Sequence, residues 1–430
     1  MTGRRWSGRR GGAAALAVLA VLLLLVGAFG VLRHGNPGRE PAPAPGPYWY
    51  GTLQTDPDRA RTEFAHGIRV AHLQIDWGRL EPEQGVYDEG YARELRARLD
   101  SFRAAGLRVE AGLGLNHPPS WLPNAYPESV FVNQFGERST GTPNIVFSEP
   151  VRGQVADYAR AVDRLIGLGH FWAIRIGVNE SGEFAYPSPL SEGGGPGEFW
   201  AYDSHAQESS PYPGWRPGEA MYHGKPFTRE QVTRWYDWYA GALAGGVNWQ
   251  LDLYTSLGYT GELKVLVPGA GFYPSDLRAA VDGRLTDVPS VRLVARGAGF
   301  FLTLPLIEHR DTVRIVTTAL VDGTGDPVDN GCSPGDARTD VTAPDDAAVR
   351  DWSSARWVAA VARSAGFTRL AGESAGPQVS PYRPGVTETA FRQMASCGLE
   401  GMMWAFDRQL YDGTPGSSLA EYAATIRRHA

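Results

Sequence analysis

Eight segments rich in β-branched and aromatic residues alternate with helical patterns from residue 48 onward, and this repeat constrains the fold more than any other feature. Eight strand–helix units favour a parallel sheet that closes into a (β/α)8 (TIM) barrel. A doubly wound open sheet is the alternative, but the glycine-rich phosphate-binding fingerprint expected after its first strand is missing. The expected strands are Tyr48–Leu53, Val70–Trp77, Arg108–Leu115, Ala173–Val178, Leu263–Gly269, Val313–Val321, Thr368–Gly372 and Gly401–Phe406.

Residues 48–430 form the expected barrel domain, which is longer than the roughly 250 residues typical of this fold. We therefore expect long loops, and two stand out: the aromatic-rich residues 184–227 after the fourth strand, and the Asp- and Gly-rich residues 322–346 after the sixth. Both follow strands, so they should emerge at the C-terminal face, where such barrels place their active sites.

The first 47 residues predict a membrane-tethering segment in three parts. Residues 1–10 carry four arginines and indicate a cytoplasmic basic tail, whereas residues 11–32 are uncharged and long enough to form a transmembrane signal-anchor. Residues 33–47 are Pro-rich and predict an extended stalk. By the positive-inside rule the barrel should be extracytoplasmic at the cell membrane. Cleavage as a signal peptide, which would make the protein secreted, is the alternative.

The formal net charge of the chain is -6, although that value includes the arginine cluster of the N-terminal tail. The remainder is therefore more acidic, and we expect no nucleic-acid partner. The chain has two cysteines, Cys332 and Cys397. An oxidising compartment would permit a disulfide between them, but the expected layout puts them at opposite ends of the barrel and argues against it.

Two glutamates stand where strands end: Glu180 in Asn179-Glu180-Ser-Gly-Glu183 after the fourth, and Glu373 in Leu370-Ala-Gly-Glu373 after the seventh. Because the strands of the barrel are parallel, both glutamates should lie at the same end of the barrel. Hydrolysis of a glycosidic bond needs one acid to protonate the leaving oxygen and one carboxylate to attack or to activate water. Glu180 and Glu373 are thus the predicted catalytic pair of a glycoside hydrolase that needs no cofactor or metal, and Asn179 is placed to bind a sugar hydroxyl.

The first half of the barrel resembles the β-galactosidases of glycoside hydrolase family 42. The resemblance is carried by Gly67-Ile-Arg-Val, Ile75-Asp-Trp-Gly-Arg-Leu80-Glu-Pro-Glu-Gln-Gly85-Val-Tyr-Asp, Ala105-Gly-Leu-Arg-Val and Pro118-Pro-Ser-Trp-Leu122. It implies a clan A barrel and a retaining β-glycosidase, in which Glu180 is the acid/base and Glu373 the nucleophile. It further implies that Trp404, at the end of the eighth strand, forms the floor of the sugar-binding site.

A second, local resemblance gives a different acid. The run Gly177-Val-Asn-Glu-Ser-Gly-Glu183-Phe-Ala-Tyr-Pro-Ser188 is similar to the acid-bearing segment of family 14 β-amylases. This implies that Glu183 is the acid and Glu373 the base of an inverting reaction, whereas in the first alignment Glu183 only contacts substrate. The carboxyl groups are about 5–5.5 Å apart in retaining enzymes and about 6.5–9.5 Å apart in inverting ones.

Further sugar contacts are expected from polar and aromatic residues near the strand ends. Asn116 and His117 end the third strand, while Trp77, Trp121 and Trp404 could stack on pyranose rings. The aromatic loop after the fourth strand suggests additional sugar subsites. The alternative for the tryptophans is burial in the core, and for His117 a simple turn.

A barrel that binds carbohydrate at the cell surface without hydrolysing it is a further alternative, since a fold does not guarantee an activity. An arginine partner for either catalytic glutamate, or a glutamate turned into packing, would favour this alternative.

Overall fold

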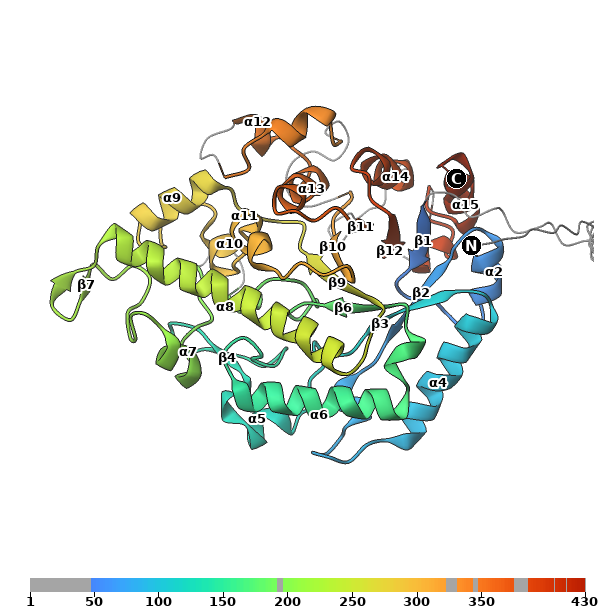
Figure 1. Ribbon diagram of the computed structural model, residues 1–430, viewed down its shortest axis with the longest axis horizontal. Coiled ribbons are helices and arrows are strands. Elements are labelled where there is room, and N and C mark those ends of the chain that lie inside the picture. Colours follow the sequence, from blue (N-terminus) through green and yellow to red (C-terminus); the bar gives the residue numbers. More distant parts are fainter. Residues whose placement is uncertain are drawn as a thin grey trace, which may run out of the picture. The chain divides into compact units, whose positions relative to one another are not determined.

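Eight parallel strands pair in a closed ring in the order β1–β2–β3–β6–β9–β10–β11–β12, with β12 pairing back to β1 (Figure 1). The computed structural model describes residues 48–191, 196–321, 331–342, 347–374, 386–405, 407–414 and 416–429. The eight strands coincide with the eight that the sequence predicts, and most end earlier than expected. They are β1 Trp49–Thr52, β2 Val70–Gln74, β3 Arg108–Gly112, β6 Ala173–Ile176, β9 Glu262–Val267, β10 Val313–Thr317, β11 Leu370–Glu373 and β12 Gly401–Trp404.

Side chains along each strand alternate between the barrel interior and the layer of helices outside it, as the period of two requires. One cluster fills the interior and includes Trp49, Val316 and Met403. The neighbouring strand positions, such as Met402 and Trp404, belong to the larger core between strands and helices. This alternation decides which side chains can reach a site at the mouth of the barrel.

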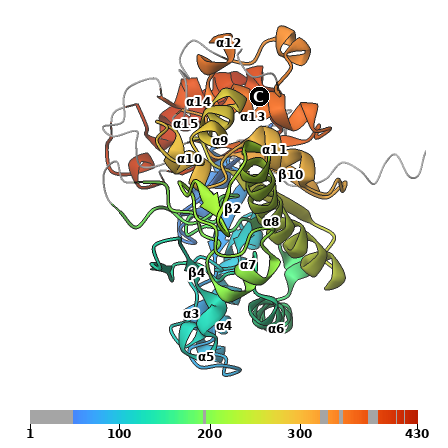
Figure 2. The same cartoon turned by 90° about the vertical axis from the view of Figure 1, so that its left-hand side faces the viewer.

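Helices cover the outside of the ring, with α4 and α6 on one side and α13, α14 and α15 on the other (Figure 2). The longest, α8, begins at a capping box formed by Thr228 and Gln231. The helices are α2 Ala60–Ala65, α3 Trp77–Leu80, α4 Glu89–Ala104, α5 Leu122–Ala125, α6 Glu149–Leu165, α7 Ser204–Ser209, α8 Arg229–Ser256, α9 Pro274–Asp282, α10 Val291–Ala295, α11 Phe300–Thr303, α12 Ala347–Arg350, α13 Ser354–Ser364, α14 Val386–Ser396 and α15 Leu419–His429.

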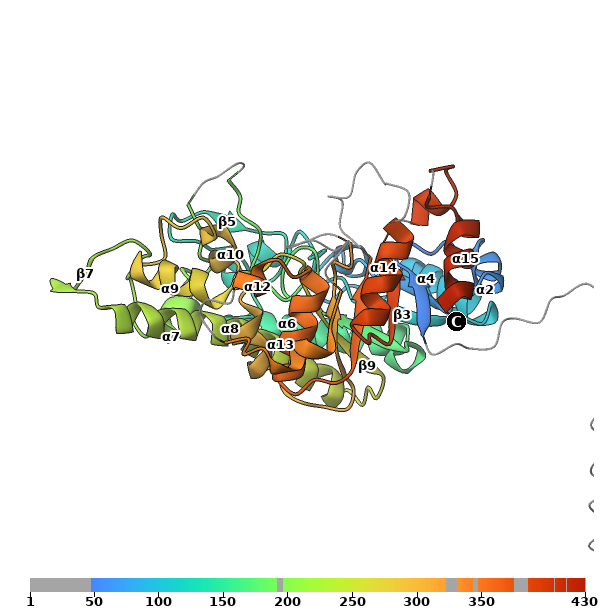
Figure 3. The ribbon, with the colours of Figure 1, turned by 90° about the horizontal axis from the view of Figure 1, so that it is seen from above.

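The long insertion expected after the fourth barrel strand is present between β6 and α8 and contains α7 and the hairpin of β7 (Met221–Tyr222) and β8 (Lys225–Pro226). The hairpin lies at the far end of the insertion (Figure 3). Trp200 and Trp215 are fully buried, and Trp215 stacks on Phe227 with ring centroids 4.3 Å apart. The expectation that these aromatic residues form sugar subsites is therefore wrong, because they are the insertion's own core. A second small hairpin pairs β4 (Phe131–Val132) with β5 (Arg138–Ser139).

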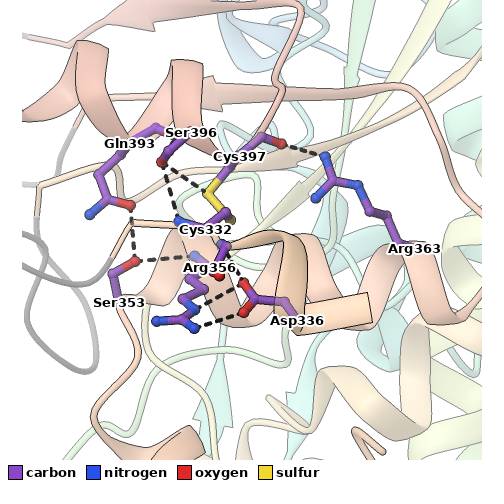
Figure 4. The surroundings of a disulfide bond; sticks show 9 residues. Cys332, Asp336, Ser353, Arg356, Arg363, Gln393, Ser396 and Cys397 are labelled. Atoms are coloured by element: carbon purple, nitrogen blue, oxygen red, sulfur yellow. Dashed lines mark hydrogen bonds and ion pairs between the residues drawn. A yellow bond between two sulfur atoms is a disulfide. The ribbon is translucent and has the colours of Figure 1, made fainter. Parts of the chain in front are cut away.

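Cys332 and Cys397 form a disulfide, with Cα atoms 4.8 Å apart, so the expectation from the layout is wrong (Figure 4). Cys397 follows α14, and the Cys332 backbone N–H donates a 3.2 Å hydrogen bond to Ser396 Oγ on the same helix. Residues 331–342 are also held by Asp336, whose carboxylate accepts two hydrogen bonds from Arg356 on α13 at 2.7 and 2.9 Å. A long loop can therefore reach residues far from the strand end at which it starts.

The expected basic tail, anchor and stalk, residues 1–47, lie outside the described residues. Among the helices that the structure does describe, none is long and apolar enough to cross a bilayer.

Candidate active site

A pocket of about 380 Å³ opens where the barrel strands end. Its volume lies within the range of about 300–1,000 Å³ seen for small-molecule sites. Strands β2, β3, β6 and β11 and the turn after β6 supply its wall, so it lies where (β/α)8 barrels place their sites. Polar groups in the wall include His72, Gln74, Asn116, Arg175, Asn179 and Glu373.

The turn after β6 folds back on the strand and returns Glu183 to the strand end. The Asn179 side chain accepts hydrogen bonds from the backbone N–H groups of Ser181 (3.0 Å) and Glu183 (2.7 Å), which closes the turn. Gly182 adopts a φ of 74°, a left-handed conformation that suits glycine. At Gly177 a Cβ atom would lie 1.8 Å from the Gly182 carbonyl oxygen, so only glycine permits this close return.

Glu183 and Glu373 are linked through Thr318, the residue that follows β10. Thr317 on β10 pairs in register with Gly372 on β11, so the next residues, Thr318 and Glu373, are neighbours across the two strands. The Thr318 hydroxyl donates a 2.7 Å hydrogen bond to the Glu183 carboxylate. The Glu183 charge also helps to raise the pKa of Glu373. Glu183, from the turn after β6, therefore acts electrostatically on Glu373 at the end of β11.

Glu373 is buried at the end of β11 and paired with Arg175, whose Nη2 lies 2.9 Å from its Oε2. Burial raises the pKa of Glu373, the charges of Glu110 and Glu183 act in the same direction, and Arg175 opposes them. Arg175 is therefore the group that favours the ionised form of Glu373.

Glu180 points elsewhere. Its carboxylate accepts hydrogen bonds from the Ser188 backbone N–H, at 3.2 Å to each oxygen. Neither Glu180 nor Glu183 is among the described residues that line the pocket. The Glu180 backbone carbonyl accepts a 3.2 Å hydrogen bond from Asn116. The turn thus directs the two glutamates, three residues apart, to different surroundings.

Of the predicted polar contacts, Asn116 and Asn179 line the pocket. His117 is exposed, and its carbonyl accepts a hydrogen bond from the Gly78 backbone N–H at 3.0 Å. The simple-turn alternative therefore describes His117 better than sugar contact does.

Two of the three tryptophans predicted to stack on sugar are core residues. Trp77 has no exposed surface, stacks on Tyr158 with ring centroids 4.8 Å apart, and donates from its indole nitrogen to Glu81 at 2.7 Å. Trp404 also has no exposed surface and packs against Tyr422 of α15. The expectation that Trp404 floors the site is wrong, because Met403 takes the inward position on β12.

Trp121 is partly exposed, but its indole nitrogen donates to the Glu81 carbonyl at 2.9 Å and its ring packs edge-on against Trp77. It does not belong to the described lining of the pocket. Trp121 therefore supports the core around α3 rather than this site.

The sequence reasoning missed the polar residues inside the barrel: His72 and Gln74 on β2, Glu110 on β3, Arg175 on β6 and Lys264 on β9. The signal was available, because these residues stand at alternate positions of strands that otherwise carry apolar side chains. An inward polar position in a closed barrel indicates a charge network or a binding site.

The closed parallel ring defines the fold class, a (β/α)8 barrel. Two solved β-galactosidases share this fold. The enzyme from Bacillus circulans sp. alkalophilus is 12% identical with a TM-score of 0.51, covering 83% of this chain and 50% of that one. The enzyme from the psychrophilic Marinomonas ef1 is 14% identical, also with a TM-score of 0.51, covering 88% and 58%.

The family resemblance is confirmed for the first part of the barrel: residues 52–165 match glycoside hydrolase family 42, described as Beta-galactosidase. Over these residues the chain is similar to that family. Beta-galactosidase BgaA of Clostridium cellulovorans is 33% identical over 73 residues, and a beta-galactosidase of Thermus thermophilus is 37% identical over 87. The aligned parts cover 17% and 19% of this chain but only 11% and 13% of those relatives. The family match ends at Leu165, before any of the candidate catalytic glutamates.

Proposed function

We propose that the protein hydrolyses O-glycosidic bonds of an oligo- or polysaccharide, with Glu183 and Glu373 as the carboxylate pair. The observation that carries the proposal is the position of Thr318, which donates a hydrogen bond to Glu183 and is the neighbour of Glu373 across the two strands. The similarity to family 42 over the first part of the barrel supports the reaction class. It does not decide which glutamates react, because they lie outside the matched residues.

In the proposed reaction Glu183 donates its proton to the glycosidic oxygen as the bond from that oxygen to the anomeric carbon breaks. Glu373 accepts a proton from the attacking water, whose oxygen forms the new bond to the anomeric carbon. The product has inverted configuration. Arg175 suits Glu373 to the role of base, because its positive charge stabilises the ionised carboxylate.

A retaining β-galactosidase-like reaction with Glu180 as acid/base is the second candidate. The Asn179-Glu180 pair at the end of the fourth barrel strand and the family 42 match favour it. The hydrogen bond from Ser188 to Glu180 argues against it, because Glu180 could then act only if the turn rearranged when substrate binds.

Three variants separate these candidates: E183Q, E180Q and E373Q. The proposal expects E183Q and E373Q each to lower kcat/KM by about 10²–10⁴-fold, the usual contribution of acid–base catalysis, and E180Q to have a small effect. Glu180 and Glu183 belong to one turn, so each variant controls for the other. An aryl glycoside whose leaving group needs no protonation should restore turnover to E183Q but not to E373Q.

The first anomer formed, followed by NMR on a panel of oligosaccharides, gives an independent answer. An inverted product supports Glu183, whereas a retained product together with an inactive E180Q would replace it by Glu180. Near wild-type turnover by E373Q would reject both candidates.

The arginine partner of Glu373 also suits a carbohydrate-binding barrel without hydrolytic activity. Wild-type protein that binds glycans of the panel without cleaving any of them would support this alternative.

The proposed location is the outer side of the cell membrane, with residues 11–32 as anchor. The disulfide between Cys332 and Cys397 supports this placement, since such bonds persist mainly in oxidising compartments. Protease added to intact cells should remove the barrel domain, whereas a protected domain would contradict the placement.

A further inference from the structure

A row of four alternating charges runs through the barrel interior and ends at Glu373. Lys264 Nζ contacts the Glu110 carboxylate, Glu110 Oε1 lies 2.9 Å from Arg175 Nη1, and Arg175 Nη2 lies 2.9 Å from Glu373 Oε2. The side chains of Lys264 and Glu110 are each 1% exposed, and those of Arg175 and Glu373 are 14% and 11% exposed. We call these four residues the charge ladder.

The interior of a (β/α)8 barrel is usually filled by layers of branched apolar side chains, so a ladder of ions needs a reason. Buried ions are costly unless their charges balance and their hydrogen bonds are made. With Glu373 ionised, the ladder holds two cations and two anions and is neutral. With Glu373 protonated, these four residues carry one net positive charge.

Lys264 lies between two indole rings, 4.1 Å from the Trp49 centroid and 4.2 Å from the Trp172 centroid. These rings separate the lower end of the ladder from solvent and stabilise the ammonium group through cation–π contacts. The position is therefore closed, and the Lys264 charge acts on the other members of the ladder with little screening.

Two more titratable side chains interact with members of the ladder: His72 from β2 with Arg175 and Glu110, and Glu183 from the turn after β6 with Glu373. Burial, followed by the charge of Arg175, lowers the pKa of His72 to about 4, so this side chain is neutral at ordinary pH. Its Nδ1 lies 2.8 Å from the Leu53 carbonyl, which can only accept, so the proton of the neutral ring is on Nδ1.

The other strands contribute no titratable partner to Glu373 in the described structure. The interior cluster presents Trp49 from β1, Val316 from β10 and Met403 from β12. Lower on β10, Arg314 pairs instead with Glu262 at 3.2 Å and Glu400 at 3.6 Å.

From this geometry we infer that Lys264 and Glu110 are positioning residues, which hold Arg175 against Glu373 and set the pH range in which Glu373 is ionised. The inference deepens the proposed function and rests on it, because it concerns the carboxylate proposed to act as base. Neither Lys264 nor Glu110 lines the pocket within the described residues, so their effect passes through Arg175.

The charge balance predicts that K264M shifts the pH dependence of kcat/KM and that adding E110Q reverses this shift. K264M leaves two anions and one cation, so Glu373 should keep its proton to higher pH. The acidic limb of kcat/KM should then move upward by about one pH unit, the smaller end of the usual effect of a neighbouring charge. K264M/E110Q restores neutrality, and the limb should return towards its wild-type position.

Methionine at position 264 can fill the space between the two indoles, so K264M is suited to folding. Lys225, exposed on β8, is the other lysine of the chain and provides the matched control K225M. The inference is overturned if K264M leaves the acidic limb in place, or if K264M and K264M/E110Q shift it equally. A merely structural role of Lys264 would lower kcat without moving the limb.

Thermal unfolding of the full-length protein between pH 5 and 8 tests the same coupling without turnover. K264M places the folded pKa of Glu373 further above its unfolded value, so K264M should lose stability relative to wild type as pH rises through that pKa. Adding E373Q in the K264M background should abolish the extra pH dependence; an unchanged slope would refute the coupling. If the pH dependence of stability is as expected but the protein hydrolyses no glycan, the proposed function is wrong, whereas the coupling within the charge ladder is supported.

Discussion

Breaking the disulfide between Cys332 and Cys397 should lower the stability of the barrel by an amount that follows from the loop it closes. The two residues are 65 positions apart, for which loop-closure entropy gives about 4 kcal/mol at 25 °C. Unfolding entropy is about 2.1 cal/mol/K per residue, or about 0.8 kcal/mol/K for a barrel domain of roughly 380 residues. Dividing the first value by the second predicts that Tm falls by about 5 °C.

The assay is calorimetric unfolding of wild type, wild type with reductant, and the double variant Cys332→Ser/Cys397→Ala. Alanine replaces Cys397 because that side chain is fully buried, and alanine introduces no hydroxyl group that would need a hydrogen-bond partner. Reductant should lower the Tm of the wild type to near that of the variant and leave the variant unchanged. A variant within about 1 °C of wild type would refute the reasoning, because the cross-link would then not restrict the unfolded chain as assumed.

Three further predictions test core packing, the turn and a buried acid. Trp77→Ala should cost about 3–5 kcal/mol in denaturant unfolding while leaving KM unchanged, since Trp77 packs in the core; a raised KM with full stability would restore it to the sugar site. Gly177→Ala should cost about 3 kcal/mol and reduce activity, because its Cβ meets the Gly182 carbonyl; a crystal structure with an unchanged turn would contradict this. Burial, followed by the charge of Glu63, raises the pKa of Asp407 to about 7, so wild type should lose about 2 kcal/mol of stability from pH 5 to 7, and Asp407→Asn should remove that slope; equal slopes would show that another group titrates.

The barrel could be predicted because its signals are local and repeated. Each strand carries β-branched or aromatic residues over a short run and is followed by a helical period, so errors at the ends, such as Val313–Val321 against the observed Val313–Thr317, do not change the topology. The position of Glu373 followed directly, because it comes immediately after the predicted strand Thr368–Gly372.

The choice between Glu180 and Glu183 could not be made in the same way. Both belong to one turn, and their directions depend on the Asn179 side chain, on Gly177 and on the hydroxyl of Thr318, which follows β10 and is 135 positions away from Glu183. The second resemblance nevertheless pointed to Glu183 from the sequence around it.

The amino-acid sequence by itself determined that eight strands alternate with helices and that acids stand at strand ends, because periodicity and propensity act over a few residues. Only the tertiary structure decided that Trp404 faces α15, that Cys332 reaches Cys397, and that Glu373 terminates a row of buried charges. These outcomes depend on strand register and on contacts between distant segments, and a shift of one residue exchanges the inner and outer faces of a strand.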